Sequence, residues 1–216
     1  MALKLHGIPV STCTTRVLAC AYEKGLEIEI VPVNLLAGEH KTPDFLATKN
    51  PFGQIPVLED GDLSLFESRA INKYIATKYK DQGTDLLREG DPKEAALVGV
   101  WLEVEAQHYN PAVGDLVYEL VIRPMHGGAT REEVVKAESE KLGKVLDVYE
   151  ARLSKTKYLA GDFFSLADLH HLPYTYYMMK TAKKDLIESR PHVKAWWEEL
   201  VSRPAVKKAV AGMTLV

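Results

Sequence analysis

The chain has 216 residues, of which 46% are hydrophobic and 26% are charged, and its 27 basic and 30 acidic residues give a formal net charge of −3. These values are typical of a globular protein with one large or two modest domains, and they exclude a disordered, collagen-like or low-complexity chain. Nucleic-acid binding usually requires a basic surplus or stripe, which this chain lacks, so we expect no nucleic-acid partner.

Residues 1–80 alternate short β-rich and helical segments. A helix is predicted over 12–24, because Gly25 follows it in a position that favours helix C-termini. Pro32 places the second strand at a sheet edge or a strand end. The Asp-Gly pair at 60–61 lies between apolar runs and predicts a hairpin. The predicted order is βαβ, an irregular stretch and then ββα, with strands at 3–6, 28–33, 56–58 and 63–66 and a last helix at 68–79.

The pattern changes after Tyr79. The polar segment 81–91 contains two glycines and is predicted to be a linker. Almost every stretch beyond it has helical periodicity, so we predict an all-α domain over 92–216. Its expected helices lie at about 92–120, 131–153, 166–180, 191–201 and 204–211.

The sequence contains no candidate membrane span or secretory signal. It has no apolar run of the roughly 18 residues that a spanning helix needs, and the opening MALKLHGIPV lacks the continuous apolar stretch of a signal peptide. Cys13 and Cys20 fall within one predicted helix, too far apart to form a disulfide there. We therefore expect reduced thiols, a cytoplasmic location and no membrane partner.

Ser11 lies between the first predicted strand and the first predicted helix. Serine is a preferred N-cap residue, which is the structural interpretation of this position. A helix N-terminus also has free N–H groups and a partial positive charge, so a hydroxyl there could stabilise a thiolate or another small anion. Both interpretations remain open on these residues alone.

Three further segments could bind a small peptide. If the Ile55–Pro56 bond is cis, the backbone of Ile55 turns outward, where an extended peptide could pair with it. The pair Glu67–Ser68 could hold an ammonium and a carboxylate, although helix capping also explains it. The pair His40–Lys41 could bind a carboxylate, although charged loops are usually solvated surface.

Together these segments resemble the cytosolic glutathione S-transferases. The runs NPFGQIPVLEDGD at 50–62 and LFESRAI at 65–71, in a thioredoxin-like domain that precedes a helical domain, are similar to that family. The runs EHK, NPFGQ, FESRAI and STCTTRV resemble the plant phi class most closely. In the second half, YLAGD at 158–162 and SLAD at 165–168 resemble the buried capping box of the family's helical domain. The resemblance covers essentially the whole chain.

The resemblance implies an enzyme that conjugates the glutathione thiolate to hydrophobic electrophiles, with reduction of organic hydroperoxides as a further activity. Ser11 would be its catalytic residue, and Arg16 would support it from nearby. Glutathione would be a co-substrate, no metal would be needed, and the protein would be a homodimer. The resemblance implies that His40 and Lys41 bind the glycyl end of glutathione, that Gln54, Ile55 and Pro56 bind its cysteinyl unit, and that Glu67 and Ser68 bind its γ-glutamyl end. Thr12, next to Ser11, is a further implied glutathione-binding residue.

Two alternatives to conjugation stay open. A non-catalytic carrier of flavonoid-like or other hydrophobic ligands has less need of a thiolate, so Ser11 favours the enzyme without excluding the carrier. A thiol-transferase would use Cys13. That residue comes two positions after Ser11, roughly 200° around the helix, so we do not expect it to face the same pocket.

The helical half carries further expectations. Ser165 and Asp168 have the spacing of a capping box. The adjacent residues His170 and His171 should point about 100° apart, which argues against a shared metal. The Trp196–Trp197 pair is expected to be one core residue and one half-exposed neighbour. The resemblance implies an electrophile site between the domains, and its candidate residues are Ile8, Pro9, Leu35, Tyr109, Val113, Leu116 and Tyr118. For the two aromatic candidates, Tyr109 and Tyr118, packing in the helical core is the alternative.

Overall fold

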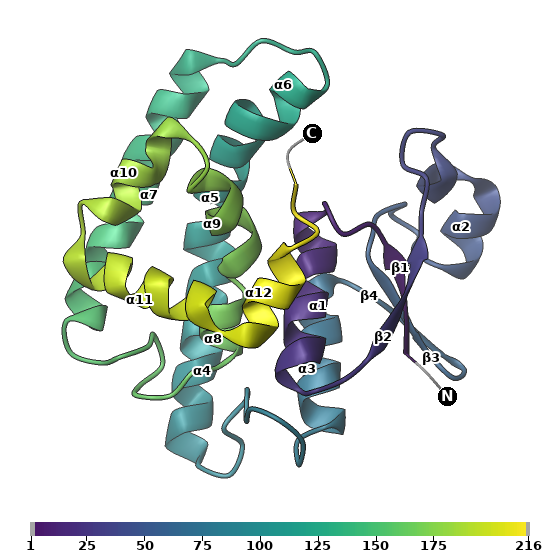
Figure 1. Ribbon diagram of the computed structural model, residues 1–216, viewed down its shortest axis with the longest axis horizontal. Coiled ribbons are helices and arrows are strands. Elements are labelled where there is room, and N and C mark those ends of the chain that lie inside the picture. Colours follow the sequence, from purple (N-terminus) through teal and green to yellow (C-terminus); the bar gives the residue numbers. More distant parts are fainter. Residues whose placement is uncertain (1–2, 215–216) are drawn as a thin grey trace. The chain divides into compact units, whose positions relative to one another are not determined.

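The computed structural model describes residues 3–214 and separates into two units (Figure 1). Unit 1 comprises residues 1–86 and 204–216, and unit 2 comprises residues 87–203. Unit 1 combines a four-stranded sheet with helices, whereas unit 2 has helices and loops. Within the described part of the chain, no helix is both long and apolar enough to cross a membrane.

The sheet of unit 1 has the strand order β2-β1-β3-β4. β1 and β2 are parallel and are joined by helix α1 (Thr12–Glu23), whereas β3 is antiparallel to both β1 and β4. Gly61, with φ of +66°, lies in the predicted hairpin between β3 and β4. Pro32 ends β2 at the sheet edge, as predicted, since proline has no N–H to donate to a neighbouring strand. The strands are β1 (Leu3–Gly7), β2 (Ile28–Pro32), β3 (Val57–Asp60) and β4 (Leu63–Phe66).

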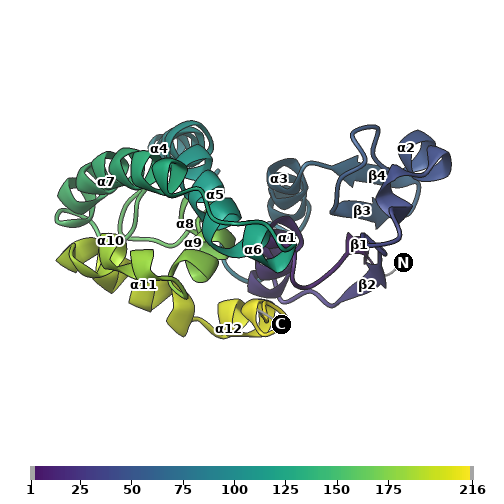
Figure 2. The same cartoon turned by 90° about the horizontal axis from the view of Figure 1, so that it is seen from above.

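Helices cover both faces of this sheet (Figure 2). Helices α1 and α3 (Ser68–Lys78) pack together on one face, and α2 (Pro43–Thr48) lies on the other. The α2 side has its own apolar core, in which Phe45 packs with Val33 and Val57. The sequence prediction of an irregular stretch here was wrong. Helix α2 is too short to show a helical period, and it is held instead by its cap, where the Phe45 N–H donates to Thr42 Oγ1 at 3.3 Å.

The C-terminal segment of the chain is part of unit 1. Helix α12 (Pro204–Val210) packs along α1 (Figure 1), and Lys208 Nζ lies 3.1 Å from Glu27 Oε1. Beyond α12, Gly212 approaches the loop that follows β1. A Cβ atom at Gly212 would lie 2.4 Å from Pro9 Cβ, so this close approach requires glycine.

Unit 2 begins with one long helical stretch that two π-helical segments interrupt. The stretch runs from α4 through η2, α5 and η3 to α6, and so ends slightly beyond the single helix predicted over 92–120. Unit 2 contains α4 (Pro92–Val104), η2 (Glu105–Tyr109), α5 (Asn110–Val117), η3 (Tyr118–Ile122), α6 (Arg123–Met125), α7 (Glu132–Leu153), α8 (Leu166–Leu169), α9 (Leu172–Met178), η4 (Ala182–Lys184), α10 (Asp185–Glu188) and α11 (Pro191–Ser202).

The predicted capping box is present at the start of α8. The Ala167 N–H donates to Ser165 Oγ at 3.2 Å, and the Ser165 N–H donates to Asp168 Oδ2 at 3.1 Å. Asp168 Oδ1 also accepts from the Leu159 N–H at 3.0 Å and from Trp196 Nε1 at 2.9 Å. Complete burial raises the pKa of Asp168 to about 6, although these hydrogen bonds lower it in part. Asp168 therefore ties α8 to α11 and to the preceding loop.

The expectation of a half-exposed tryptophan was wrong. Trp196 and Trp197 are both buried. Together with Val193 and Leu200 they form an i, i+3, i+4, i+7 stripe on α11, so both rings face the core of unit 2.

Candidate functional site

Ser11 is the N-cap of α1, at the end of the loop that follows β1. Its Oγ accepts from the Thr14 N–H at 3.4 Å, which confirms the structural interpretation. The loop itself is held by the Ser11 N–H, which donates to Ile8 O at 3.0 Å, and by Thr15 Oγ1, which donates to Pro9 O at 2.9 Å. Capping uses a lone pair of the Ser11 oxygen, so its O–H proton can still be donated to a ligand.

Two predicted segments, 39–41 and 50–56, lie against each other. Gly53 has φ of +58°, and a Cβ atom there would lie 2.7 Å from His40 O and 2.8 Å from Lys41 Cδ. Lys41 Nζ donates to Phe52 O at 3.1 Å. Only glycine permits this approach, which brings the His40 and Lys41 segment next to the loop that carries Gln54 and Ile55.

The 50–56 loop is held from inside by Asn50, which is buried. Asn50 Nδ2 donates to Gln54 O at 2.9 Å, and its Oδ1 accepts from the Phe52 N–H at 2.9 Å. The Ile55–Pro56 peptide bond is cis, as expected. Pairing between β1 and β3 begins at His6 and Val57, so Ile55 lies just before the ladder.

Glu67 and Ser68 lie at the start of α3. Val57 pairs with Phe66, so the register of β3 and β4 brings Glu67 beside the Ile55–Pro56 segment. Glu67 has φ of 69° and ψ of 103°, which is a strained conformation for a residue with a side chain. Its side chain is exposed, whereas Ser68 is buried at 5% exposure.

Arg16 links the two helices that carry these residues. Its side chain is completely buried, and Nη1 donates to Ser68 Oγ at 2.8 Å and contacts Cys13 Sγ at 3.5 Å. Thr12 is also buried, in the first turn of α1. Sequence spacing indicated only that Arg16 lies near Ser11. Its contact with a residue 52 positions away depends on how α1 packs on α3 and has no signal in the sequence.

The structure therefore joins the candidate residues into two groups within unit 1. His40 and Lys41 contact the loop with Gln54, Ile55 and Pro56, and Arg16 contacts Ser68. Ser11 is positioned by its own loop and helix. This arrangement offers a hydroxyl at a helix N-terminus, a backbone segment outside the ladder, and charged side chains of both signs.

The electrophile candidates in unit 2 fall mainly in its core. Tyr109, Val113 and Leu116 are fully buried. The Tyr109 hydroxyl lies 2.6 Å from Thr175 Oγ1, its ring stacks on Tyr149 at 5.6 Å, and burial raises its pKa. The alternative of core packing is thus confirmed for Tyr109, whereas Tyr118 is 46% exposed.

The histidine pair of unit 2 also belongs to this core. His170 and His171 are buried, and His171 Nε2 lies 2.8 Å from the Tyr149 hydroxyl. In residues 3–214 there is no group of three or more His, Cys, Asp or Glu side chains that could hold a metal ion.

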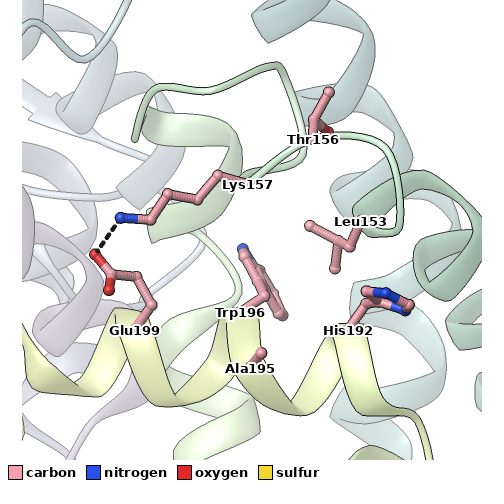
Figure 3. Close-up of a pocket in the computed structure, with 7 residues that line it drawn as sticks. All are labelled: Leu153, Thr156, Lys157, His192, Ala195, Trp196 and Glu199. Atoms are coloured by element: carbon pink, nitrogen blue, oxygen red, sulfur yellow. Dashed lines mark ion pairs between the residues drawn. The ribbon is translucent and has the colours of Figure 1, made fainter.

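A separate cavity of about 210 Å³ lies between α11 and the end of α7 (Figure 3). Lys157 Nζ and Glu199 Oε1 form an ion pair of 3.2 Å at its rim, so their charges offset each other. Residues predicted to bind glutathione do not line this cavity, whose lining is Leu153, Thr156, Lys157, His192, Ala195, Trp196 and Glu199.

Comparison with known proteins identifies the class to which this fold and site belong. A model of the glutathione S-transferase N-terminal domain matches residues 1–77, and a model of the C-terminal domain of the same enzymes matches residues 109–204. Glutathione S-transferase F13 of Arabidopsis thaliana is 57% identical over 215 residues, which cover 100% of this chain and 98% of that relative.

Solved structures agree over the whole fold. Glutathione transferase F7 from Populus trichocarpa is 60% identical with a TM-score of 0.96, over 99% of this chain and 100% of that one. Glutathione S-transferase I from maize, in complex with an atrazine glutathione conjugate, is 51% identical with a TM-score of 0.92, over 99% and 98% of the two chains. The chain therefore belongs to the glutathione S-transferase family, and its resemblance to the plant phi class and the expected thioredoxin-like plus helical architecture are confirmed.

Proposed function

We propose that this protein conjugates the sulfur of glutathione to hydrophobic electrophiles, with the Ser11 hydroxyl stabilising the reacting thiolate. Membership of the family and the glutathione conjugate bound by the maize relative support the reaction. The observation that carries the role of Ser11 is its position as the N-cap of α1, with one lone pair used by the Thr14 N–H and its proton left to donate.

Glutathione as co-substrate would lie along unit 1. The cationic Lys41, with His40, would hold the glycyl carboxylate. The backbone of Ile55, between Gln54 and Pro56, would pair with the cysteinyl unit by strand addition. Glu67 would take the γ-glutamyl ammonium and Ser68 its carboxylate, while Thr12 would lie beside the reacting sulfur. The contacts of Lys41 with the 50–56 loop and of Ser68 with α1 support this order.

A hydroxyl donor is energetically sufficient for this chemistry. A free thiol with a pKa of about 8.5 is only a few per cent ionised at neutral pH, and the thiolate is the nucleophile. Lowering that pKa by about two units needs about 2.7 kcal/mol. A charge-assisted hydrogen bond supplies about 1.5–3 kcal/mol and the α1 dipole about 0.3–1 kcal/mol, so no general base is required.

In the conjugation step the thiolate attacks an electrophilic carbon. A carbon–sulfur bond forms, and the leaving group departs with the electron pair of the broken bond, or the pair moves into a conjugated acceptor. The same thiolate would attack the O–O bond of an organic hydroperoxide, which releases the alcohol. A second glutathione would then convert the resulting sulfenic acid to glutathione disulfide and water.

The pH dependence of catalysis tests this proposal. We expect Ser11→Ala to raise the pH midpoint of the conjugation rate by about 1 to 2 units, because the thiolate loses its hydrogen-bond donor. Cys13→Ser is the matched control in the same helical turn, and it should keep the wild-type profile. An unchanged profile in Ser11→Ala would remove Ser11 from the mechanism.

The same three proteins separate the alternatives. A ligand carrier would turn over slowly in all of them while binding hydrophobic ligands tightly. A Cys13-dependent thiol-transferase would lose disulfide reduction only in Cys13→Ser. Assays with a panel of electrophiles and one organic hydroperoxide, each with glutathione, cover conjugation and peroxidase chemistry together.

We further propose a homodimer in a reducing, cytoplasmic compartment. Leu97 and Val100 on α4 and Val148 on α7 are 40%, 54% and 59% exposed. Val148 also lines a mostly apolar cavity of about 310 Å³, together with Val104, His108, Lys144, Val145 and Tyr149. Exposed apolar side chains on α4 and α7 and this cavity favour a second copy of the chain as the partner. The unpaired thiols of Cys13 and Cys20 support the compartment.

A further inference from the structure

Arg16 is an unusual residue for a buried position on helix α1. Its side chain has 0% exposure, in a helix whose other buried residues include Val17 and Leu18. Burying a guanidinium removes it from water at a considerable cost in free energy, and an apolar side chain in the same volume would avoid this cost. A buried guanidinium is therefore expected to donate to polar groups of the fold, and the Ser68 hydroxyl is one of these groups.

The direction of the hydrogen bond to Ser68 suggests a role for this guanidinium. A guanidinium has donors and no acceptor, so Arg16 Nη1 must donate to Ser68 Oγ, at 2.8 Å. The Ser68 hydroxyl oxygen therefore accepts one hydrogen bond from Arg16, and its own proton has to be donated to another group. The cation also polarises this hydroxyl in a buried, weakly screened environment and makes it a stronger donor.

Ser68 begins α3, a helix of 11 residues, and follows the exposed Glu67. A carboxylate that approaches this end meets the Ser68 hydroxyl, the free N–H groups of the first turn and the positive end of the helix dipole. Arg16 lies behind the hydroxyl and cannot itself be reached from solvent.

We propose that Arg16 is a positioning residue that directs the Ser68 hydroxyl proton toward the α-carboxylate of the γ-glutamyl unit. This inference rests on the proposed function, which assigns that carboxylate to Ser68. Arg16 would thus determine affinity for one end of glutathione without contacting the ligand or the reacting sulfur.

Truncated ligands test this coupling. Calorimetry would compare glutathione with 4-aminobutyryl-cysteinyl-glycine, which lacks only the α-carboxylate, and with glutaryl-cysteinyl-glycine, which lacks only the α-amino group. We expect Arg16→Met to raise the Kd of glutathione and of the glutaryl peptide about tenfold. The Kd of the 4-aminobutyryl peptide should stay within about twofold of wild type.

Two further variants separate positioning from packing. Arg16→Lys keeps a cation and a donor, so it should recover part of the affinity for glutathione. Asn72→Ala is the structural control, because buried Asn72 also bridges α1 and α3, through Nδ2 to Arg16 O at 3.1 Å, without touching the Ser68 hydroxyl. It should weaken all three ligands equally or not at all.

The outcomes distinguish this inference from the proposed function. Equal weakening of all three ligands in Arg16→Met, or the same selective loss in Asn72→Ala, would overturn the positioning role. If the wild-type protein binds glutathione and the 4-aminobutyryl peptide with the same Kd, and Ser68→Ala does so too, the assignment of the carboxylate to Ser68 fails instead. Should Arg16→Met not fold, Arg16→Lys decides, because its loss must be confined to ligands with the α-carboxylate.

Discussion

Glu67 shows how a single residue can trade stability for a binding role. Among the proposed glutathione ligands it is the one with a positive φ, at 69°, and its side chain points to solvent. A residue with a Cβ atom in such a conformation costs about 1–3 kcal/mol. Because no packing of its own side chain offsets this strain, the carboxylate at this position is better explained by ligand binding than by folding.

Replacing Glu67 by glycine should therefore separate the two roles. We expect Glu67→Gly to raise the free energy of unfolding by about 1 kcal/mol, because glycine relieves the strained backbone. The same variant should raise the KM for glutathione by about tenfold, since the ammonium partner is lost. Urea unfolding and steady-state kinetics measure the two effects.

The control for this prediction is Glu67→Ala, which removes the carboxylate but keeps a Cβ atom. It should lose the same affinity without the gain in stability. Equal stabilities of the alanine and glycine variants would show that the backbone at this position is not strained.

At the residue scale, the sequence predicted the local capping roles of residues better than the contacts between distant residues. The N-cap role of Ser11 and the capping box of Ser165 and Asp168 follow local rules about which side chains satisfy free N–H groups, so both could be predicted. The contact of Gly53 with His40 and that of Arg16 with Ser68 could not, because each joins segments that only the tertiary fold brings together.

Among the elements, strand β3 is tied to its neighbours by one carboxylate. Glu59 on β3 accepts hydrogen bonds from Lys49, just after α2, and lies 2.9 Å from Nε2 of His6 on β1. The hydrogen bond from Lys49, followed by that from His6, lowers the pKa of Glu59 from 4.5 to about 2. One side chain thus connects α2, β1 and β3.

This pKa predicts an acid-dependent loss of stability. The folded protein holds the Glu59 proton less tightly than the unfolded chain, so the stabilisation is complete above pH 4.5 and is lost as the pH falls toward 2. Because the Glu59 side chain is 28% exposed, we expect only about 1–2 kcal/mol from this source. Glu59→Gln should flatten the curve of unfolding free energy against pH below 4.5.

Urea unfolding at several pH values from about 3 to 6, the range in which carboxylates titrate, would measure this effect. Asp62→Asn, in the exposed hairpin between β3 and β4, is the matched control and should keep the wild-type slope. If Glu59→Gln also keeps that slope, the carboxylate does not connect these elements in solution.

The strands and the longer helices could be predicted because their patterns are repeated over many residues. Helix α7, for example, matches the predicted 131–153 to within one residue. Helix α2 could not, because six residues held by a cap carry no period. The π-helical segments η2 and η3 were also missed, because each inserts an extra residue per turn while the surrounding pattern stays helical.

On the scale of the whole molecule, the proposed dimer depends on the apolar surface of α4 and α7. We expect the double variant Val100→Lys/Val148→Lys to shift the protein from dimer to monomer, since two buried ammonium groups per subunit would face an apolar partner surface. Sedimentation velocity measures the change. Met125→Lys on α6, where the native side chain is 49% exposed, is the control and should remain dimeric. A monomeric wild-type protein, or a dimeric double variant, would contradict the proposed surface.

The pairing of α12 with α1 also determines when unit 1 can be completed. Its first 86 residues leave the ribosome long before residues 204–214, with the entire helical unit translated in between. Until then, the side of α1 that α12 covers has no permanent neighbour and is available to chaperones. A nascent chain that stalls at Arg203 would carry every proposed glutathione ligand and still lack the last helix of the unit that presents them.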